Sequence, residues 1–202
     1  MLYPEISALK WHFPSGKCRL ARCRKGHVIA EPLERPSIYH TRNFPMELNE
    51  KIADFTLQTD EDKAASLSDY AGKPVILFFY PRADTPGCTI EACGFRDAFK
   101  KLQTAGAVVL GISRDTPRDQ ARFRAKFDLP YTLLADVDEK VCNQFGVLKE
   151  KNMYGKKVWG IERTTFVIGP DQTLLHVFPK VTPAGHAEEV LALVEQWKKA
   201  HK

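Results

Sequence analysis

The sequence lacks any apolar run close to the ~18–20 residues that a membrane-spanning helix needs. Its five cysteines in 202 residues are too few for a secreted fold held together by disulfides. No signal peptide with an apolar core is recognisable at the start of the chain. We therefore expect a soluble globular protein with one sizeable core, in a reducing compartment that we take to be the cytoplasm.

Several motifs of ligand-binding proteins are missing as well. The sequence has no internal repeat, no low-complexity tract and no glycine-rich loop of the kind that holds phosphates. Three histidines of the C-terminal part, His176, His186 and His201, are too dispersed to suggest metal ligation. These absences leave the cysteines as the residues most able to carry chemistry.

The net charge of +5 could suggest a nucleic-acid or membrane partner, but its distribution argues against one. Residues 1–45 hold eight Lys or Arg against three Glu, which accounts for the whole surplus. Residues 46–202 hold 22 residues of each sign and are neutral. We expect no nucleic acid and no membrane as partners of this larger part.

Residues 1–45 show no sustained periodicity and contain five prolines, so we expect a poorly ordered basic N-terminal extension. The segment could be a targeting peptide, or a basic arm in which Cys18, Cys23 and His27 touch nucleic acid or metal. We favour a third interpretation, a misassigned start for a protein whose first residue is Met46. The N-terminal mass of the native protein would decide among the three.

A buried strand followed by a helix places one cysteine at a helix N-terminus. Val75–Phe78 is an unbroken apolar run, typical of a strand buried on both faces. After Pro86 and Gly87 the pattern changes to a helical period, in which apolar residues recur every three or four positions: Cys88, Ala92, Phe95, Phe99 and Leu102. Cys88 is therefore predicted in the first turn of the helix that follows a central strand.

That position favours a thiolate over a thiol, because the first turn has free backbone N–H groups and the positive end of the helix dipole. Cys93 lies five residues further on, which turns it by ~140° and puts the two Cα atoms roughly 8–9 Å apart. A disulfide tolerates at most about 7 Å. If the two cysteines form a bond, the first turns of the helix must unwind, so we interpret the pair as a cycling redox couple.

The rest of 46–202 alternates between strands and helices, which implies a largely parallel sheet. Strands are predicted at 54–57, 108–112 and 131–134, with a polar turn at 59–63 that leads to a second short strand. A helix should begin at Pro117, and a short one should run from about Asp138 to a C-cap at Gly146.

The end of the chain has a different pattern. Strands at 164–168 and 173–178 flank a tight-turn composition and should form an antiparallel hairpin. A last helix is predicted with Thr182 as its cap and Pro183 at its first position, and with a buried face of Val190, Leu191, Leu193, Val194 and Trp197. Together these elements predict an α/β, thioredoxin-like fold with a central mixed β-sheet flanked by helices.

The stretch Pro81-x-x-x-Thr85-x-x-Cys88 resembles the active-site signature of peroxiredoxins. Cys93 at this spacing is similar to the bacterioferritin comigratory protein, or Q-type, branch of the AhpC/TSA family. The resemblance extends from about Met46 to the C-terminus and includes four further matches: 111–113, 132–134, 144–147 and 163–168. Matches in this number and order make the signal specific.

The resemblance implies a role for each site residue. Cys88 would be the peroxidatic nucleophile and Cys93 the resolving thiol. Arg163 would hold the thiolate ionised and stabilise charge on the breaking O–O bond, although an ion pair with Glu162 is the structural alternative. Thr85 would hydrogen-bond the thiolate and the peroxide, and Pro81 would shield the pocket. Arg82 is a weaker candidate, and Cys142 is expected to be a packing residue.

The implied function is a thiol peroxidase that reduces hydrogen peroxide and organic hydroperoxides through a Cys88–Cys93 disulfide. A thioredoxin or thioredoxin-like reductant would recycle it, and no metal or other cofactor is implied. The alternative is a peroxide sensor that relays oxidation to a partner protein. A disulfide oxidoreductase fits poorly because there is no C-x2-C. A monomer is expected for this branch.

Overall fold

The structure is a computed structural model in which residues 44–153 and 156–201 are described. The basic extension expected at 1–45, with Cys18, Cys23 and His27, lies outside the described residues except for its last two positions. The strands of the described part run, in chain order, over β1 (Thr56–Thr59), β2 (Ala64–Ser66), β3 (Val75–Phe79), β4 (Val108–Ser113), β5 (Thr132–Ala135), β6 (Leu148–Met153), β7 (Lys156–Ile161), β8 (Thr164–Ile168) and β9 (Leu174–Phe178).

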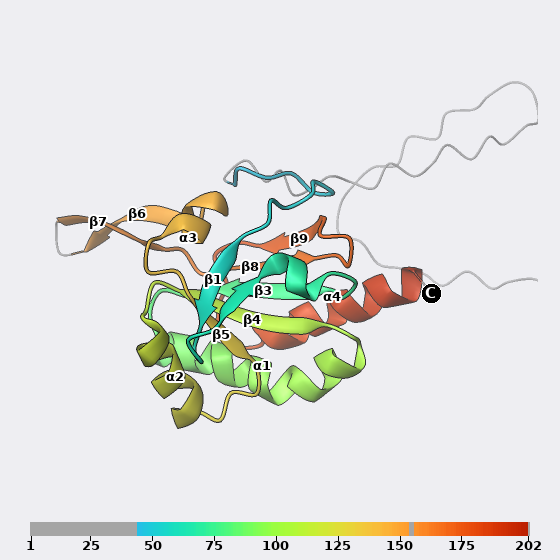
Figure 1. Ribbon diagram of the computed structural model, residues 1–202, viewed down its shortest axis with the longest axis horizontal. Helices are drawn as coiled ribbons and strands as arrows, with labels where there is room; N and C mark the ends of the chain where they lie inside the picture. Colours follow the sequence, from blue (N-terminus) through green and yellow to red (C-terminus); the bar gives the residue numbers. More distant parts are fainter. Residues whose placement is uncertain (1–43, 154–155, 202) are drawn as a thin grey trace, which may run out of the picture. The chain divides into compact units, whose positions relative to one another are not determined.

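Strand β3 lies inside a seven-stranded sheet with the order β2-β1-β5-β4-β3-β8-β9 (Figure 1). It pairs in parallel with β4, which pairs in parallel with β5. The pairs β3–β8, β8–β9, β1–β5 and β1–β2 are antiparallel. The sheet is therefore mixed, as predicted. The expectation of a largely parallel sheet was wrong, because only the three central strands pair in parallel and the outer strands join them antiparallel.

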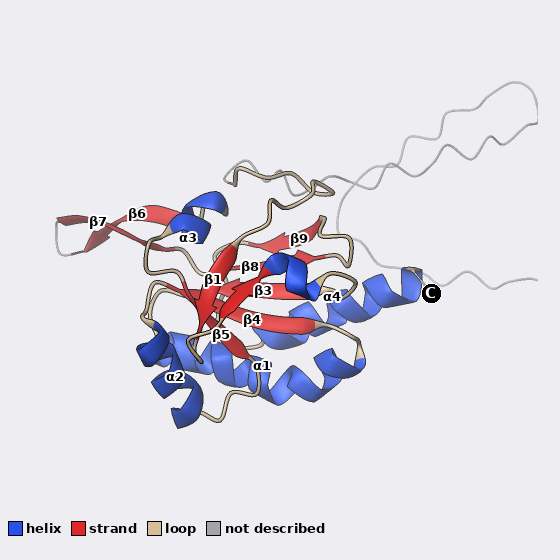
Figure 2. Ribbon diagram, viewed as in Figure 1, coloured by secondary structure: helices blue, strands red, loops and turns tan. Residues whose placement is uncertain are grey.

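Helices cover both faces of this sheet, as Figure 2 shows. One face carries α1 (Pro86–Thr104), α2 (Pro117–Lys126) and α4 (His186–Ala200). The other carries the 3-10 helix η1 (Leu67–Tyr70), the short α3 (Lys140–Gln144) and the chain that leads into β1. This layered arrangement confirms the thioredoxin-like fold.

Two hydrophobic clusters fill the space between the sheet and its cover. Side chains alternate across a strand, so Ile76, Phe78 and Tyr80 face α1 while Leu77 and Phe79 face the opposite layer. All five are at most 1% exposed. Burial of each large side chain contributes roughly 1.5–3 kcal/mol. The apolar run thus fixes β3 at the centre of the molecule and fixes where α1 begins.

The central elements lie where the sequence predicts them, whereas α4 begins later than expected. The prediction placed its cap at Thr182, but the helix starts at His186 with Gly185 at the N-cap. Gly185 adopts φ 80°, a left-handed conformation that favours glycine, so residues 183–185 bend and turn before the helix. Of the predicted buried face, Val190 and Val194 are buried, while Leu191, Leu193 and Trp197 are half-buried.

The hairpin of β6 and β7 was not predicted. The two strands form a separate antiparallel pair with Leu148 opposite Ile161, and in Figure 1 it extends away from the main sheet. Ile161 at its base is buried in the core, whereas Lys157, Val158 and Trp159 are exposed, Trp159 by 61%. A strand with so few buried residues leaves no alternating apolar pattern in the sequence.

Packing against the core already begins at Phe44, two residues before the expected domain boundary. The Phe44 ring meets Phe166 edge-on with 5.5 Å between centroids. Lys149 places its ammonium 5.4 Å from the centroid of the same Phe44 ring. The packed domain therefore begins at position 44 or earlier, and not at Met46.

Candidate active site

Cys88 is buried in the first turn of α1, as predicted. Thr85 is the N-cap and Pro86 follows it at the first helical position, where a proline needs no hydrogen-bond donor. The thiol is 1% exposed and belongs to the cluster between α1 and the sheet. The side chain of Thr85 makes no cap hydrogen bond with the helix. The N-terminal N–H groups are thus left without the usual capping oxygen.

Arg163 lies beside the sulfur. Its Nη2 donates a hydrogen bond to Cys88 Sγ over 3.3 Å, and its side chain is 14% exposed. Thr164 pairs with Phe79 across the β3–β8 ladder, so the residue just before β8 meets the end of the strand that leads to Cys88. The sulfur is thus in contact with a positively charged, planar hydrogen-bond donor.

Glu91 completes this group and was missed by the sequence analysis. Its Oε2 accepts a hydrogen bond from Arg163 Nη1, so Arg163 pairs with Glu91 and not with its neighbour Glu162. Glu91 is 1% exposed, and its Oε1 is buried without a hydrogen-bond partner. The signal was available, because a residue three positions after Cys88 lies on the same helix face.

Burial governs the electrostatics of this pair. It raises the pKa of Glu91 to about 7, although the Arg163 guanidinium acts in the opposite direction. Burial also lowers the pKa of Arg163, but the Glu91 carboxylate and the Cys88 sulfur raise it by more, so the net shift is upward. The guanidinium therefore stays charged between its two partners.

A glycine allows Arg163 to come this close to the helix. A Cβ at Gly87 would lie 3.3 Å from Arg163 Nη2 and 3.7 Å from Pro183 Cγ. The first distance is tighter than nine in ten real Cβ contacts, so a side chain at this position would shift the guanidinium by a few tenths of an ångström. Gly87 therefore has a steric role beside Cys88.

Thr85 and Pro81 are near Cys88 in sequence, but the Thr85 hydroxyl is hydrogen-bonded away from the sulfur. The Thr85 hydroxyl donates to the carbonyl of Arg82 over 3.0 Å, and Pro81 is half-buried just beyond β3. Arg82 is exposed. The loop is held by Asp115, whose Oδ2 accepts from the Ala83 N–H over 2.7 Å.

Cys93 and Cys142 are both free thiols with different surroundings. Cys93 is half-buried on α1 and is not bonded to Cys88. Cys142 is fully buried in the opposite cluster, and burial raises the pKa of its thiol. The latter environment is that of a packing residue.

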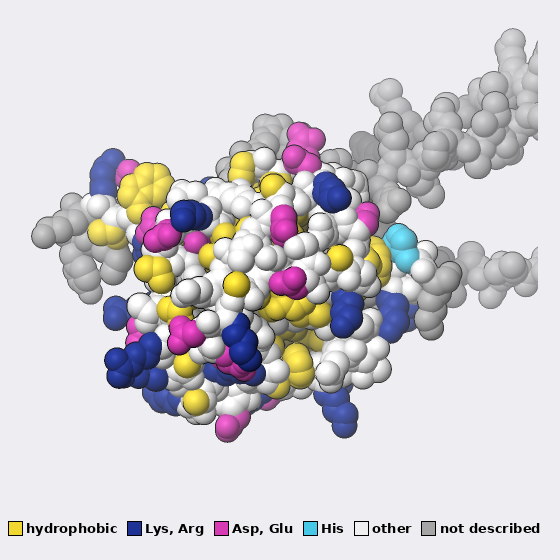
Figure 3. All heavy atoms as spheres, in the orientation of Figure 1, with side chains coloured by type: hydrophobic (Ala, Val, Ile, Leu, Met, Phe, Trp, Pro, Cys, Tyr) yellow, Lys and Arg dark blue, Asp and Glu magenta, His cyan; other side chains and the backbone are white. Residues whose placement is uncertain are grey.

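In the part of the chain that the structure describes, no group of three or more His, Cys, Asp or Glu side chains could hold a metal ion. No helix among the same residues is long and apolar enough to cross a membrane. Basic and acidic side chains lie side by side on the face seen in Figure 3.

Comparison with known proteins fits this geometry. A model of the AhpC/TSA family matches residues 48–177. The chain belongs to the AhpC/TSA family. This member is 53% identical over 146 residues to a putative peroxiredoxin bcp of Coxiella burnetii, which covers 72% of this chain and 97% of that protein. It is 41% identical over 157 residues to peroxiredoxin Bcp of Escherichia coli, with 78% and 98% covered.

Solved structures place this AhpC/TSA member in the bacterioferritin comigratory protein, or Q-type, branch. A bacterioferritin comigratory protein of Xanthomonas campestris superimposes with a TM-score of 0.69 at 39% identity, over 71% of this chain and 92% of that one. A PrxQ mutant of Xylella fastidiosa gives 0.72 at 35% identity, over 75% and 96%. The resemblance seen in the sequence is thus confirmed, and the chain is a peroxiredoxin with the thiol peroxidase function of its family.

Proposed function

We propose that this protein reduces hydrogen peroxide and small organic hydroperoxides through Cys88, forms a Cys88–Cys93 disulfide, and is recycled by a thioredoxin-like dithiol protein. The observation that carries the proposal is the 3.3 Å hydrogen bond from Arg163 to the Cys88 sulfur at the start of α1. The Xanthomonas relative, described by its alkyl peroxide reduction activity, supports the substrate class.

In the first step the Cys88 thiolate attacks one peroxide oxygen. The S–O bond forms as the O–O bond breaks, and the leaving oxygen takes up a proton and departs as water or an alcohol. Arg163 offers planar donors to the charge that develops on these oxygens, and Glu91 fixes its orientation. We assign Thr85 to the peroxide and Pro81 to the shielding of the pocket, although the Thr85 hydroxyl must first leave the Arg82 carbonyl.

In the second step the Cys93 thiolate attacks the sulfenic sulfur of Cys88. The S–S bond forms, the S–OH bond breaks, and the hydroxyl leaves as water. Both cysteines lie on one continuous helix in this structure, so the step requires α1 to unwind locally between them. An external dithiol then reduces the disulfide by thiol–disulfide exchange and is itself oxidised to a disulfide.

The deciding experiment follows NADPH consumption coupled through thioredoxin reductase and thioredoxin, with hydrogen peroxide as the substrate. Wild type should turn over and Cys88→Ser should be inactive, while Cys93→Ser should react once and then stall. Cys142→Ala is the matched control, because Cys142 lies in the opposite core cluster, and it should turn over like wild type.

A different result would indicate the sensor function. If Cys88 oxidises but wild type does not turn over with thioredoxin or another dithiol, the protein passes its oxidation to a partner protein. Size-exclusion chromatography tests the monomer that we propose, and cell fractionation of the source organism tests the proposed cytoplasmic location.

A further inference from the structure

A buried tyrosine is tied to α1 beside the resolving cysteine. The hydroxyl of Tyr131, the residue just before β5, donates to the carbonyl of Ala92 over 2.7 Å. Tyr131 is 4% exposed, and burial raises the pKa of its phenol, so the hydroxyl keeps its proton. Ala92 directly precedes Cys93 on the helix.

A second hydrogen bond joins the same loop to the same helix. Arg96 Nη1 donates to the carbonyl of Phe127 over 3.0 Å, from a position three residues after Cys93. The connection from α2 to β5 therefore binds α1 on both sides of this cysteine, through Tyr131 at Ala92 and through Phe127 at Arg96. In the described part of the chain, no other element makes a side-chain hydrogen bond to residues 92–96.

The Tyr131 bond is additional to the bonding of the helix itself. Within an α-helix the Ala92 carbonyl accepts the N–H of Arg96, so the helix does not need Tyr131 to satisfy this oxygen. The extra hydrogen bond exists only while residue 92 is in place against β5. Unwinding of α1 as far as Cys93 must break it.

We propose that Tyr131 is a positioning residue that sets how often α1 opens, and thereby the rate at which Cys93 reaches Cys88. The proposal rests on the proposed function, since it concerns the disulfide step. Tyr131 does not touch the reacting atoms of the first step, where Arg163 and Glu91 hold the sulfur environment. It slows the second step alone and lengthens the life of the sulfenic acid.

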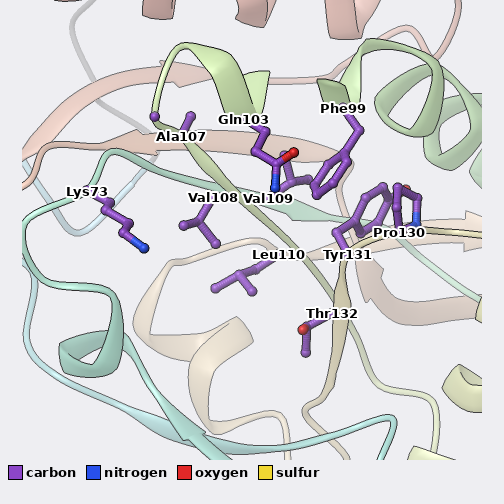
Figure 4. A pocket seen from close by; sticks show the side chains of 11 residues that line it. Lys73, Phe99, Gln103, Ala107, Val108, Val109, Leu110, Pro130, Tyr131 and Thr132 are labelled. Carbon is purple, nitrogen blue, oxygen red and sulfur yellow. The ribbon is translucent and has the colours of Figure 1, made fainter. Parts of the chain in front are cut away.

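Tyr131 lies between aromatic neighbours and a surface pocket. Its ring packs edge-on against Phe78 with 5.8 Å between centroids and lies 6.0 Å from Phe99 of α1. Figure 4 shows the Phe99 and Tyr131 rings next to one another at the edge of a pocket of about 310 Å³. Both rings therefore line this space.

We call the hydrogen bond from Tyr131 to the Ala92 carbonyl the clamp. Hydrogen exchange of the reduced protein tests it without any need for catalysis. In Tyr131→Phe, which keeps the ring, amides of residues 88–96 should exchange about fivefold faster. This factor corresponds to a loss of ~1 kcal/mol from the free energy of opening, at ~1.36 kcal/mol per tenfold change in rate. Amides of β3 in the same molecule should keep their wild-type rates. Tyr70→Phe is the matched control, because Tyr70 packs against the opposite cluster and should leave residues 88–96 unchanged.

Rapid-quench mass spectrometry after one equivalent of peroxide then separates the two steps. Cys88 should be oxidised at the wild-type rate in Tyr131→Phe, the disulfide should form about fivefold faster, and less sulfinic acid should accumulate at high peroxide. Unchanged exchange at residues 88–96, or equal disulfide rates in the two proteins, would overturn the clamp. Absence of any Cys88–Cys93 disulfide in wild type would instead refute the proposed function, while the exchange result would still decide the clamp.

Discussion

Gly94 offers the opposite perturbation of the same helix segment. It lies inside α1 directly after Cys93, where alanine is about 0.5–1 kcal/mol more favourable than glycine. A Cβ built at this position would lie 3.6 Å from the Cβ of Ala187 on α4, which is ordinary van der Waals contact. The substitution Gly94→Ala therefore fits without strain and stabilises the helical state.

The size of the effect follows from these two terms. The helix preference and the new contact with Ala187 together stabilise the folded helix by about 1 kcal/mol, with packing adding a few tenths. If α1 unwinds through residue 94 during resolution, this stabilisation is lost in the open state. Disulfide formation should then be about five- to tenfold slower, at ~1.36 kcal/mol per tenfold.

Rapid-quench mass spectrometry measures this rate directly, as the fraction of Cys88–Cys93 disulfide against time. The slower step should also increase the sulfinic acid formed at high peroxide. Thr104→Ala is the control, since it raises helix propensity at the far end of α1 and should leave resolution unchanged. An unchanged disulfide rate in Gly94→Ala would refute the idea that unwinding reaches this residue and limits the step.

Three other changes give distinct results. Arg163→Lys keeps the charge but not the planar fork, so the second-order rate of Cys88 oxidation by peroxide, followed by stopped flow, should fall about 100-fold. Glu91 has its pKa raised from 4.5 to about 7, so its contribution to stability is fully present below pH 4.5 and is lost as the pH rises through 7. In urea unfolding, the free energy of unfolding of Glu91→Gln relative to that of wild type should rise by up to ~3 kcal/mol between pH 4.5 and 8. A difference that does not vary with pH would contradict this. Gly111→Ala would bring a Cβ within 2.6 Å of Phe78 and 2.7 Å of Leu133, so unfolding should cost ~1–3 kcal/mol less, and a wild-type urea midpoint would contradict the packing argument.

The sequence predicts the elements whose residues are buried in a repeating pattern. The apolar run of β3 and the helical period from Cys88 to Leu102 both reflect the two core clusters, so their positions could be predicted closely. Among the described side chains of β6 and β7 only Ile161 is buried, so the hairpin left no such pattern. The start of α4 was misplaced because a Thr-Pro pair is a good helix start, whereas the chain turns once more at Gly185.

The site was predicted in part for a similar reason. Cys88 and Arg163 stand in recognisable local sequence, and the structure places them in contact. Glu91 and Tyr131 act through neighbours that are 72 and 39 residues away in sequence, at Arg163 and Ala92. Such partners are set by how the sheet brings helices and loops together, which a linear pattern does not show.

The pairing of β3 with β8 gives the two chemical steps different temperature dependence. The Arg163–Cys88 contact is fixed between neighbouring strands in the middle of the sheet, so the reaction with peroxide needs little rearrangement. Resolution needs α1 to open, and unfolding rates change by about three- to sixfold per 10 °C. Under the proposed mechanism, cooling should therefore slow disulfide formation more than peroxide attack. In the cold the enzyme should then spend a larger part of each cycle as sulfenic acid and be more easily inactivated by its own substrate.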